Sequence, residues 1–121
     1  MYTRITSSNN TNYDTNTYRT KNGRHIFKFR YKIQRTNSGQ LYYEIVILEQ
    51  PSYGSRLSSA GITHRLTSSE LGKKRICIYD HKLVFATGTL KKARNLSMAW
   101  ADMTSVYILT GKTIDNQIAG R

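Results

Sequence analysis

The sequence is poor in acidic residues, and this shortage is its strongest global feature. Only 7 Asp and Glu stand against 19 Lys and Arg in 121 residues, which gives a formal net charge of +12 at neutral pH. A chain with this charge attracts polyanions such as nucleic acid, acidic membrane surfaces or acidic proteins. Most of the cations must lie at the surface, because burying an unpaired charge is costly.

The sequence also has few cysteines and no long apolar segment. The single cysteine, Cys77, excludes a disulfide within the chain and favours a reducing, intracellular compartment. No apolar run approaches the roughly 18 residues of a membrane span, and the N-terminus lacks the apolar core of a signal peptide. We therefore expect neither a membrane span nor a signal peptide.

Groups that could carry out catalysis or bind a metal are scattered. The seven acidic residues form no close pair at a spacing typical of acid–base catalysis. The stretch "CIYDH" at 77–81 offers too few ligands for zinc, and "SELGKKR" lacks the upstream glycine of a phosphate-binding loop. We expect a protein without cofactor, metal or enzymatic activity, and a nuclease or other hydrolase is the less favoured alternative.

Composition divides the chain into three parts. Residues 1–23 are basic and rich in Asn, Thr and Ser. They predict a flexible arm, because such a polar segment buries too little apolar surface to offset the entropy of ordering. Residues 24–112 hold most of the apolar side chains and predict a single small α+β domain. Residues 113–121 are expected to form a C-terminal tail.

Two segments with a period of two predict a β-hairpin. In "RHIFKFRYKIQR" at 24–35 the odd positions are aromatic or apolar and the even positions are mostly basic or polar. "LYYEIVILE" at 41–49 is apolar on both sides and favours a more central strand. "TNSGQ" between them is typical of a turn. A second hairpin is predicted from residues 73–80 and 83–87, and a short strand near 62–66.

The segment after residue 88 predicts one amphipathic helix of about 16–20 residues. Thr89 is a suitable N-cap and Gly111 a suitable C-terminal cap. The run "SVYIL" leaves open an end near Met103 followed by a strand. The apolar residues recur at spacings of three and four: Leu90, Ala93, Leu96, Trp100, Met103 and Tyr107. The expected fold is therefore a three- to four-stranded antiparallel sheet with this helix packed on one face, against the aromatic side of 25–33.

The predicted strand and helix in "VFATGTLKKARNLSMAWA" at 84–101 resemble two families: plant AP2-type DNA-binding domains and the N-terminal DNA-binding domains of integrases. The resemblance covers less than a fifth of the chain. Those domains lay a three-stranded sheet in the major groove. The resemblance implies a sheet of this kind and contact with DNA, and it assigns no role to any single residue.

Three basic clusters are candidate binding sites for an anion. Lys28, Arg30 and Lys32 alternate on one face of a strand, about 6.6 Å apart, a spacing that suits successive phosphates. The alternative is a solvated face balanced by Glu44 of the neighbouring strand. A second cluster lies at the helix start, where the helix dipole disfavours cations but the free N–H groups suit a phosphate. It is equally consistent with an ordinary polar helix face. The third cluster, at residues 73–75, begins the strand predicted at 73–80.

These clusters predict a small basic protein that binds DNA or RNA through phosphate contacts of a basic sheet face and a helix N-terminus. The alternative is a non-enzymatic adaptor or inhibitor that docks on an acidic protein within a larger complex. Tyr42, Tyr43 and Tyr53 are candidates for stacking on bases. The candidate nucleic-acid-binding residues are Arg24, Lys28, Arg30, Lys32, Lys73, Lys74, Arg75, Lys91, Lys92 and Arg94.

Overall fold

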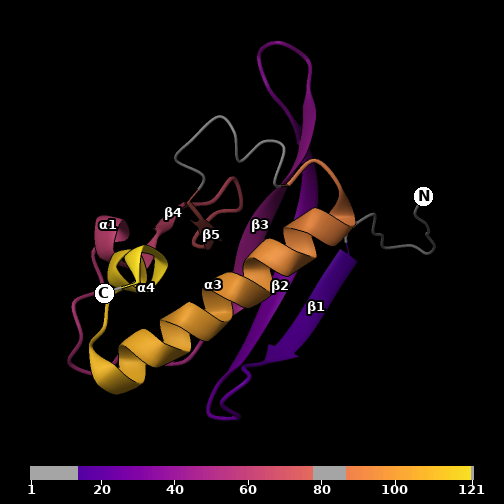
Figure 1. Ribbon diagram of the computed structural model, residues 1–121. Coiled ribbons are helices and arrows are strands. Elements are labelled where there is room, and N and C mark those ends of the chain that lie inside the picture. The colour runs from indigo at the N-terminus through magenta and orange to yellow at the C-terminus, as the bar shows by residue number, and fades with distance from the viewer. Residues whose placement is uncertain (1–13, 78–86, 121) are drawn as a thin grey trace.

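Five antiparallel strands form one sheet, and a long helix packs across one of its faces (Figure 1). The computed structural model describes residues 14–77 and 87–120. The strand order is β1-β2-β3-β5-β4. The expected α+β architecture is confirmed, with more strands than expected. The strands are β1 (Asp14–Arg19), β2 (Ile26–Arg35), β3 (Leu41–Glu49), β4 (Arg65–Thr67) and β5 (Lys74–Ile76), and the helices are α1 (Ala60–Thr63), α3 (Leu90–Thr110) and α4 (Ile114–Ala119).

The predicted hairpin of β2 and β3 forms the centre of the sheet, and its turn projects beyond the N-terminal end of α3 (Figure 1). Alternation along β2 places Phe27, Phe29 and Tyr31 on the side of α3, where each is at most 1% exposed. Lys28 and Arg30 point by the same alternation to the opposite side. The period-two pattern of the sequence therefore specifies which face of β2 is buried.

Trp100 lies at the centre of the core between the sheet and α3. Its ring meets Phe27 and Phe29 edge to face, with centroids 5.4 and 6.1 Å apart, a favourable geometry for aromatic pairs. Its indole Nε1 donates a hydrogen bond to the carbonyl oxygen of Thr63, 3.0 Å away. Trp100 thus ties the segment before β4 to the helix as well as filling the core.

Helix α3 begins and ends at the predicted caps. The Thr89 hydroxyl accepts a hydrogen bond from the amide of Lys92, and Gly111 adopts the left-handed conformation after the last turn. The open alternative of an end near Met103 is wrong, because the helix continues to Thr110. Tyr107 explains this continuation: its ring packs against Tyr53 in the interior, and such tertiary packing overrides a low helix propensity.

The N-terminal arm predicted for residues 1–23 requires a correction. Residues 14–19 form β1 and pair with β2. Of the predicted arm, residues 1–13 lie outside the described residues. The Tyr18 hydroxyl and the Lys21 amide both donate hydrogen bonds to the carboxylate of Asp102 on α3. The amino-acid composition of residues 1–23 reflects only how much side-chain surface they can bury. It does not reveal the backbone pairing with β2 or this polar anchor on the helix.

The second half of the sheet also differs from expectation. Strand β5 is shorter than the predicted 73–80 and pairs with β3 and β4, while the predicted partner at 83–87 lies almost entirely outside the described residues. The short strand expected near 62–66 occurs slightly later, as β4.

The predicted C-terminal tail contains α4, since Thr113 caps a helix there and Ile114 is buried in the core. Within the described ranges, no helix has the length and apolarity to cross a membrane.

Candidate nucleic-acid interface

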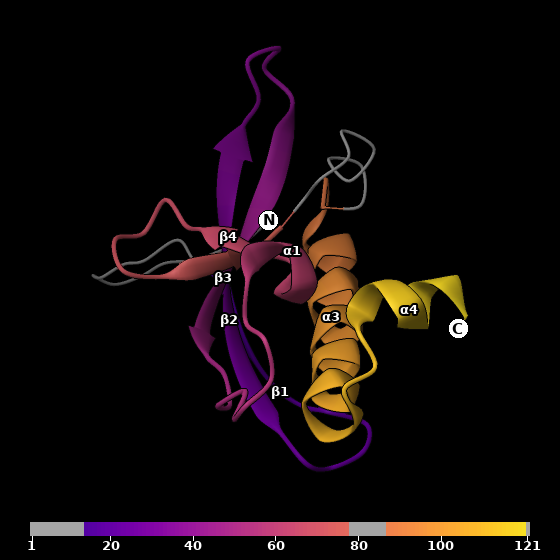
Figure 2. The same ribbon diagram turned by 90° about the vertical axis from the view of Figure 1, so that its left-hand side faces the viewer.

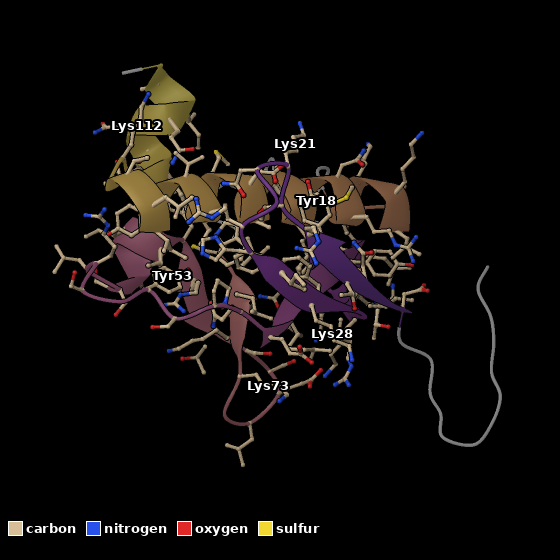
Figure 3. All side chains as sticks on the ribbon, turned by 90° about the horizontal axis from the view of Figure 1, so that it is seen from below. Tyr18, Lys21, Lys28, Tyr53, Lys73 and Lys112 are labelled. Atoms are coloured by element: carbon tan, nitrogen blue, oxygen red, sulfur yellow. The ribbon has the colours of Figure 1, made fainter. Side chains whose placement is uncertain are left out.

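Five of the ten candidate residues share the face of the sheet that α3 does not cover. Arg30 and Arg75 flank Val46 in register, so the three residues form a row across adjacent strands. Lys28 and Lys73 both lie on the side of the sheet away from the helix (Figure 3). We call this surface the basic sheet face and define it by Lys28, Arg30, Lys32, Lys73 and Arg75.

The other candidates lie elsewhere, so the structure does not unite the predicted clusters. Arg24 is exposed in the turn between β1 and β2. Lys74 points by alternation to the opposite side of β5 from Arg75. The remaining three occupy the start of α3, across the sheet, where Arg94 lies 3.6 Å from the carboxylate of Asp14: Lys91, Lys92 and Arg94. One straight ligand cannot contact both the helix start and the middle of the basic sheet face, because the sheet separates them.

The cations of β2 have an internal counter-charge that the sequence did not indicate. Glu70, in the loop between β4 and β5, places its Oε1 atom 2.7 Å from Arg30 Nη1. Its Oε2 atom lies 3.8 Å from Lys32 Nζ. The β4–β5 hairpin projects away from α3 (Figure 2). This hairpin brings Glu70 over β2, where the side chains of Arg30 and Lys32 are mostly covered, with 29% and 18% of their surface exposed.

Glu44, which the sequence suggested as the balancing acid, has a different role. Its carboxylate is 4% exposed and accepts hydrogen bonds from the side chains of Ser68, Ser69 and Gln34 and from the Ser69 amide, at 2.6 to 2.9 Å. Burial alone would raise the pKa of Glu44, but these hydrogen bonds outweigh burial and hold the pKa below its usual value. Glu44 therefore fastens the β4–β5 loop onto the basic sheet face.

The Glu44 anchor predicts a pH-dependent contribution to stability. Because the folded pKa is depressed, this contribution is complete above the ordinary carboxyl pKa of about 4.3 and is lost as pH falls through the folded pKa. Glu44→Gln is expected to lower the free energy of unfolding by about 1–3 kcal/mol at pH 7. Urea unfolding should show that this deficit shrinks between pH 7 and pH 3, because the stabilisation by the Glu44 carboxylate declines as the pH falls toward and through its lowered pKa. An equal deficit at both pH values would contradict the assignment, and Glu49→Gln on the exposed end of β3 is the matched control.

Two other acidic side chains also have hydrogen-bond partners other than lysine or arginine side chains. Asp102 accepts hydrogen bonds from the Tyr18 hydroxyl and the Lys21 amide. Asp115 lies 2.9 Å from the Nε2 atom of His64. These carboxylates act as internal anchors between elements. Within the described residues, neither carboxylate lies in an ion pair with a lysine or arginine side chain.

The structure sorts the stacking candidates by exposure. Tyr53 is buried at 8% exposure, and the Arg65 guanidinium lies 4.4 Å above its ring, so it has no free face for a base. Tyr43 is partly buried against the core. Tyr42 pairs with Gln34 and therefore shares the side of the basic sheet face. Of the three, Tyr42 retains the position for contact with a ligand on that face.

Sequence reasoning missed two sets of residues on this face. Thr15 and Thr17 of β1 lie in register with Arg30 and Lys28, which brings two hydroxyl groups beside the cations. They were missed because β1 was assigned to the arm. Glu70 was missed because its contact with β2 spans 40 residues of sequence. The one available signal was the turn chemistry of "SELG" within a long loop, where functional residues are common.

The described residues offer no cluster for metal binding, and their one cysteine is not activated as a nucleophile. No group of three or more His, Cys, Asp or Glu side chains within residues 14–77 and 87–120 could hold a metal ion. Cys77 is buried, and burial raises the pKa of its thiol while nearby Arg75 lowers it by less. A thiol with a raised pKa is a poor nucleophile at neutral pH.

Comparisons with protein-family models, with curated proteins and with solved structures found no match to this chain.

Proposed function

We propose that this protein binds nucleic acid and that the basic sheet face contacts the phosphate backbone. The observation that supports the proposal best is the placement of charge. Five cations gather on the one face of the sheet that α3 leaves uncovered. Three carboxylates form hydrogen bonds with hydroxyl, amide or imidazole groups: Glu44, Asp102 and Asp115. Lys28, Lys73 and Arg75, whose side chains form no ion pair with Glu70 within the described residues, therefore offer positive charge on this face to an external polyanion.

The spacing of the face suits an extended anion. Side chains two residues apart on β2 are about 6.6 Å apart, and neighbouring strands are separated by about 4.8 Å. Lys28 lies two residues from Arg30 along β2, and Arg75 lies two strands across from Arg30 in the same row. The hydroxyls of Thr15 and Thr17 can donate to phosphate oxygens beside these cations. Such contacts position a nucleic acid without reading its sequence.

The test is a salt titration of the wild-type protein with generic duplex DNA and RNA. We expect dissociation constants in the micromolar range or below at about 50 mM salt. If Lys28, Lys73 and Arg75 alone each neutralise one phosphate, affinity falls by at least about 40-fold between 50 and 200 mM salt. Failure to bind either polymer at the lower salt concentration would contradict the proposal. Recovery of one acidic protein after nuclease treatment would then favour the adaptor.

A further inference from the structure

Glu70 places a carboxylate between two cations of the basic sheet face. Its Oε1 atom accepts a hydrogen bond from Arg30 Nη1 at 2.7 Å, and its Oε2 atom is 3.8 Å from Lys32 Nζ. The Glu70 side chain is 15% exposed. This carboxylate holds the two side chains in the arrangement that a phosphate with two free oxygens would require, since Arg and Lys recognise both groups by the same charge-assisted contacts.

The contact is incomplete, which makes it exchangeable. Glu70 Oε2 is shielded from solvent and accepts no hydrogen bond within the described part of the chain. A buried acceptor without a hydrogen bond opposes the stabilisation that the ion pair provides. A phosphate group presents more acceptor oxygens than a carboxylate and can satisfy Arg30 and Lys32 together. Exchange of Glu70 for a phosphate is therefore chemically favoured on this face.

The loop that carries Glu70 is fastened through its backbone, since the Glu70 amide donates to the Ser68 hydroxyl and the Glu70 carbonyl accepts from the Lys73 amide, whereas only the Glu70 side chain reaches Arg30 and Lys32. Ser68 and Ser69 are bound to Glu44, and the Ser68 amide donates to the Lys73 carbonyl at 2.9 Å. Leu71, next to Glu70, is fully exposed. The Glu70 side chain can consequently leave Arg30 and Lys32 while these backbone contacts and the anchor on Glu44 stay intact.

We infer that Glu70 is a built-in competitor for nucleic-acid phosphates: it occupies Arg30 and Lys32 in the free protein and limits the affinity of the basic sheet face. This inference rests on the proposed function. When a nucleic acid binds, its phosphates take over Arg30 and Lys32, and the Glu70 carboxylate turns to solvent.

The experiment compares Glu70→Gln with Glu49→Gln in binding to generic duplex DNA and RNA at about 100 mM salt. Both substitutions remove one negative charge. Glu49 lies at the exposed end of β3, opposite Lys28, so it controls for net charge near the same face. We expect affinity to rise about fivefold or more for Glu70→Gln and less than about twofold for Glu49→Gln. Thermal unfolding of both variants verifies that the fold is retained.

A double-mutant cycle separates competition from general electrostatics. The Glu70→Gln gain should disappear when Arg30 and Lys32 are both glutamine, because the competitor then has nothing to occupy. A gain that persists in that background would overturn the inference. Equal gains for Glu70→Gln and Glu49→Gln would overturn it as well, because net charge would then be sufficient.

Different results refute the proposed function and the competitor role of Glu70. If the wild-type protein binds nucleic acid and Glu70→Gln binds no more tightly, the competitor role is wrong and the proposed function stands. If neither the wild-type protein nor Glu70→Gln binds DNA or RNA, both the proposed function and the competitor role are wrong.

Discussion

Replacing Trp100 by alanine should lower the free energy of unfolding by about 3–5 kcal/mol. The side chain is 2% exposed and fills the space between α3 and the aromatic residues of β2. Its removal also leaves the Thr63 carbonyl without its indole donor. A domain of this size is stable by only about 5–15 kcal/mol, so the variant loses a large share of its stability.

Urea unfolding followed by far-ultraviolet circular dichroism measures this loss, because fluorescence is unsuitable once the single tryptophan is gone. Trp100→Phe is the matched control. It keeps an aromatic ring in contact with Phe27 and Phe29 and removes chiefly the hydrogen bond, so it should cost about 1–3 kcal/mol. A loss below about 1 kcal/mol for Trp100→Ala would show that Trp100 is not central to the core.

Local pattern was sufficient to predict the elements whose side chains alternate with a clear period. The buried side of β2 follows from Phe27, Phe29 and Tyr31 at odd positions, and both caps of α3 follow from Thr89 and Gly111. In each case the information lies within a few residues of sequence. These are the conditions under which periodicity and capping chemistry determine structure.

Long-range pairing explains what the sequence did not predict. Strand β1 has the composition of a disordered segment and is ordered by pairing with β2 and by the Tyr18–Asp102 hydrogen bond, whose partners are 84 residues apart. The candidate site likewise combines residues that local sequence predicts with a residue that only long-range contacts bring into place. Lys28, Arg30 and Lys32 were predicted from their spacing on one strand, and Lys73 and Arg75 from a run of basic residues. Glu70 was not, because only the tertiary fold brings the β4–β5 loop over Arg30 and Lys32.

Neutralising the basic sheet face should have a far larger effect on nucleic-acid binding than neutralising the helix start. The variant Lys28→Gln, Lys73→Gln, Arg75→Gln removes three cations that lie on one face, and the Glu70 carboxylate forms an ion pair with none of the three within the described residues. The variant Lys91→Gln, Lys92→Gln, Arg94→Gln removes the same charge across the sheet. Net charge is identical in the two variants, so any difference reports where the ligand lies.

Counterion release sets the expected sizes. Loss of three phosphate contacts should lower affinity by about 100-fold or more near 100 mM salt and reduce the slope of log affinity against log salt by about 2.7. The helix-start variant should lose less than about fivefold and keep the wild-type slope, because it weakens only the long-range field. Thermal unfolding of both variants confirms that the fold is intact.

The salt-dependent affinity of these two variants for the same duplex is the most direct test of nucleic-acid binding by the basic sheet face. The account predicts a large loss and a shallower salt dependence for Lys28→Gln, Lys73→Gln, Arg75→Gln alone. Equal losses in the two variants, or a larger loss in Lys91→Gln, Lys92→Gln, Arg94→Gln, would contradict it.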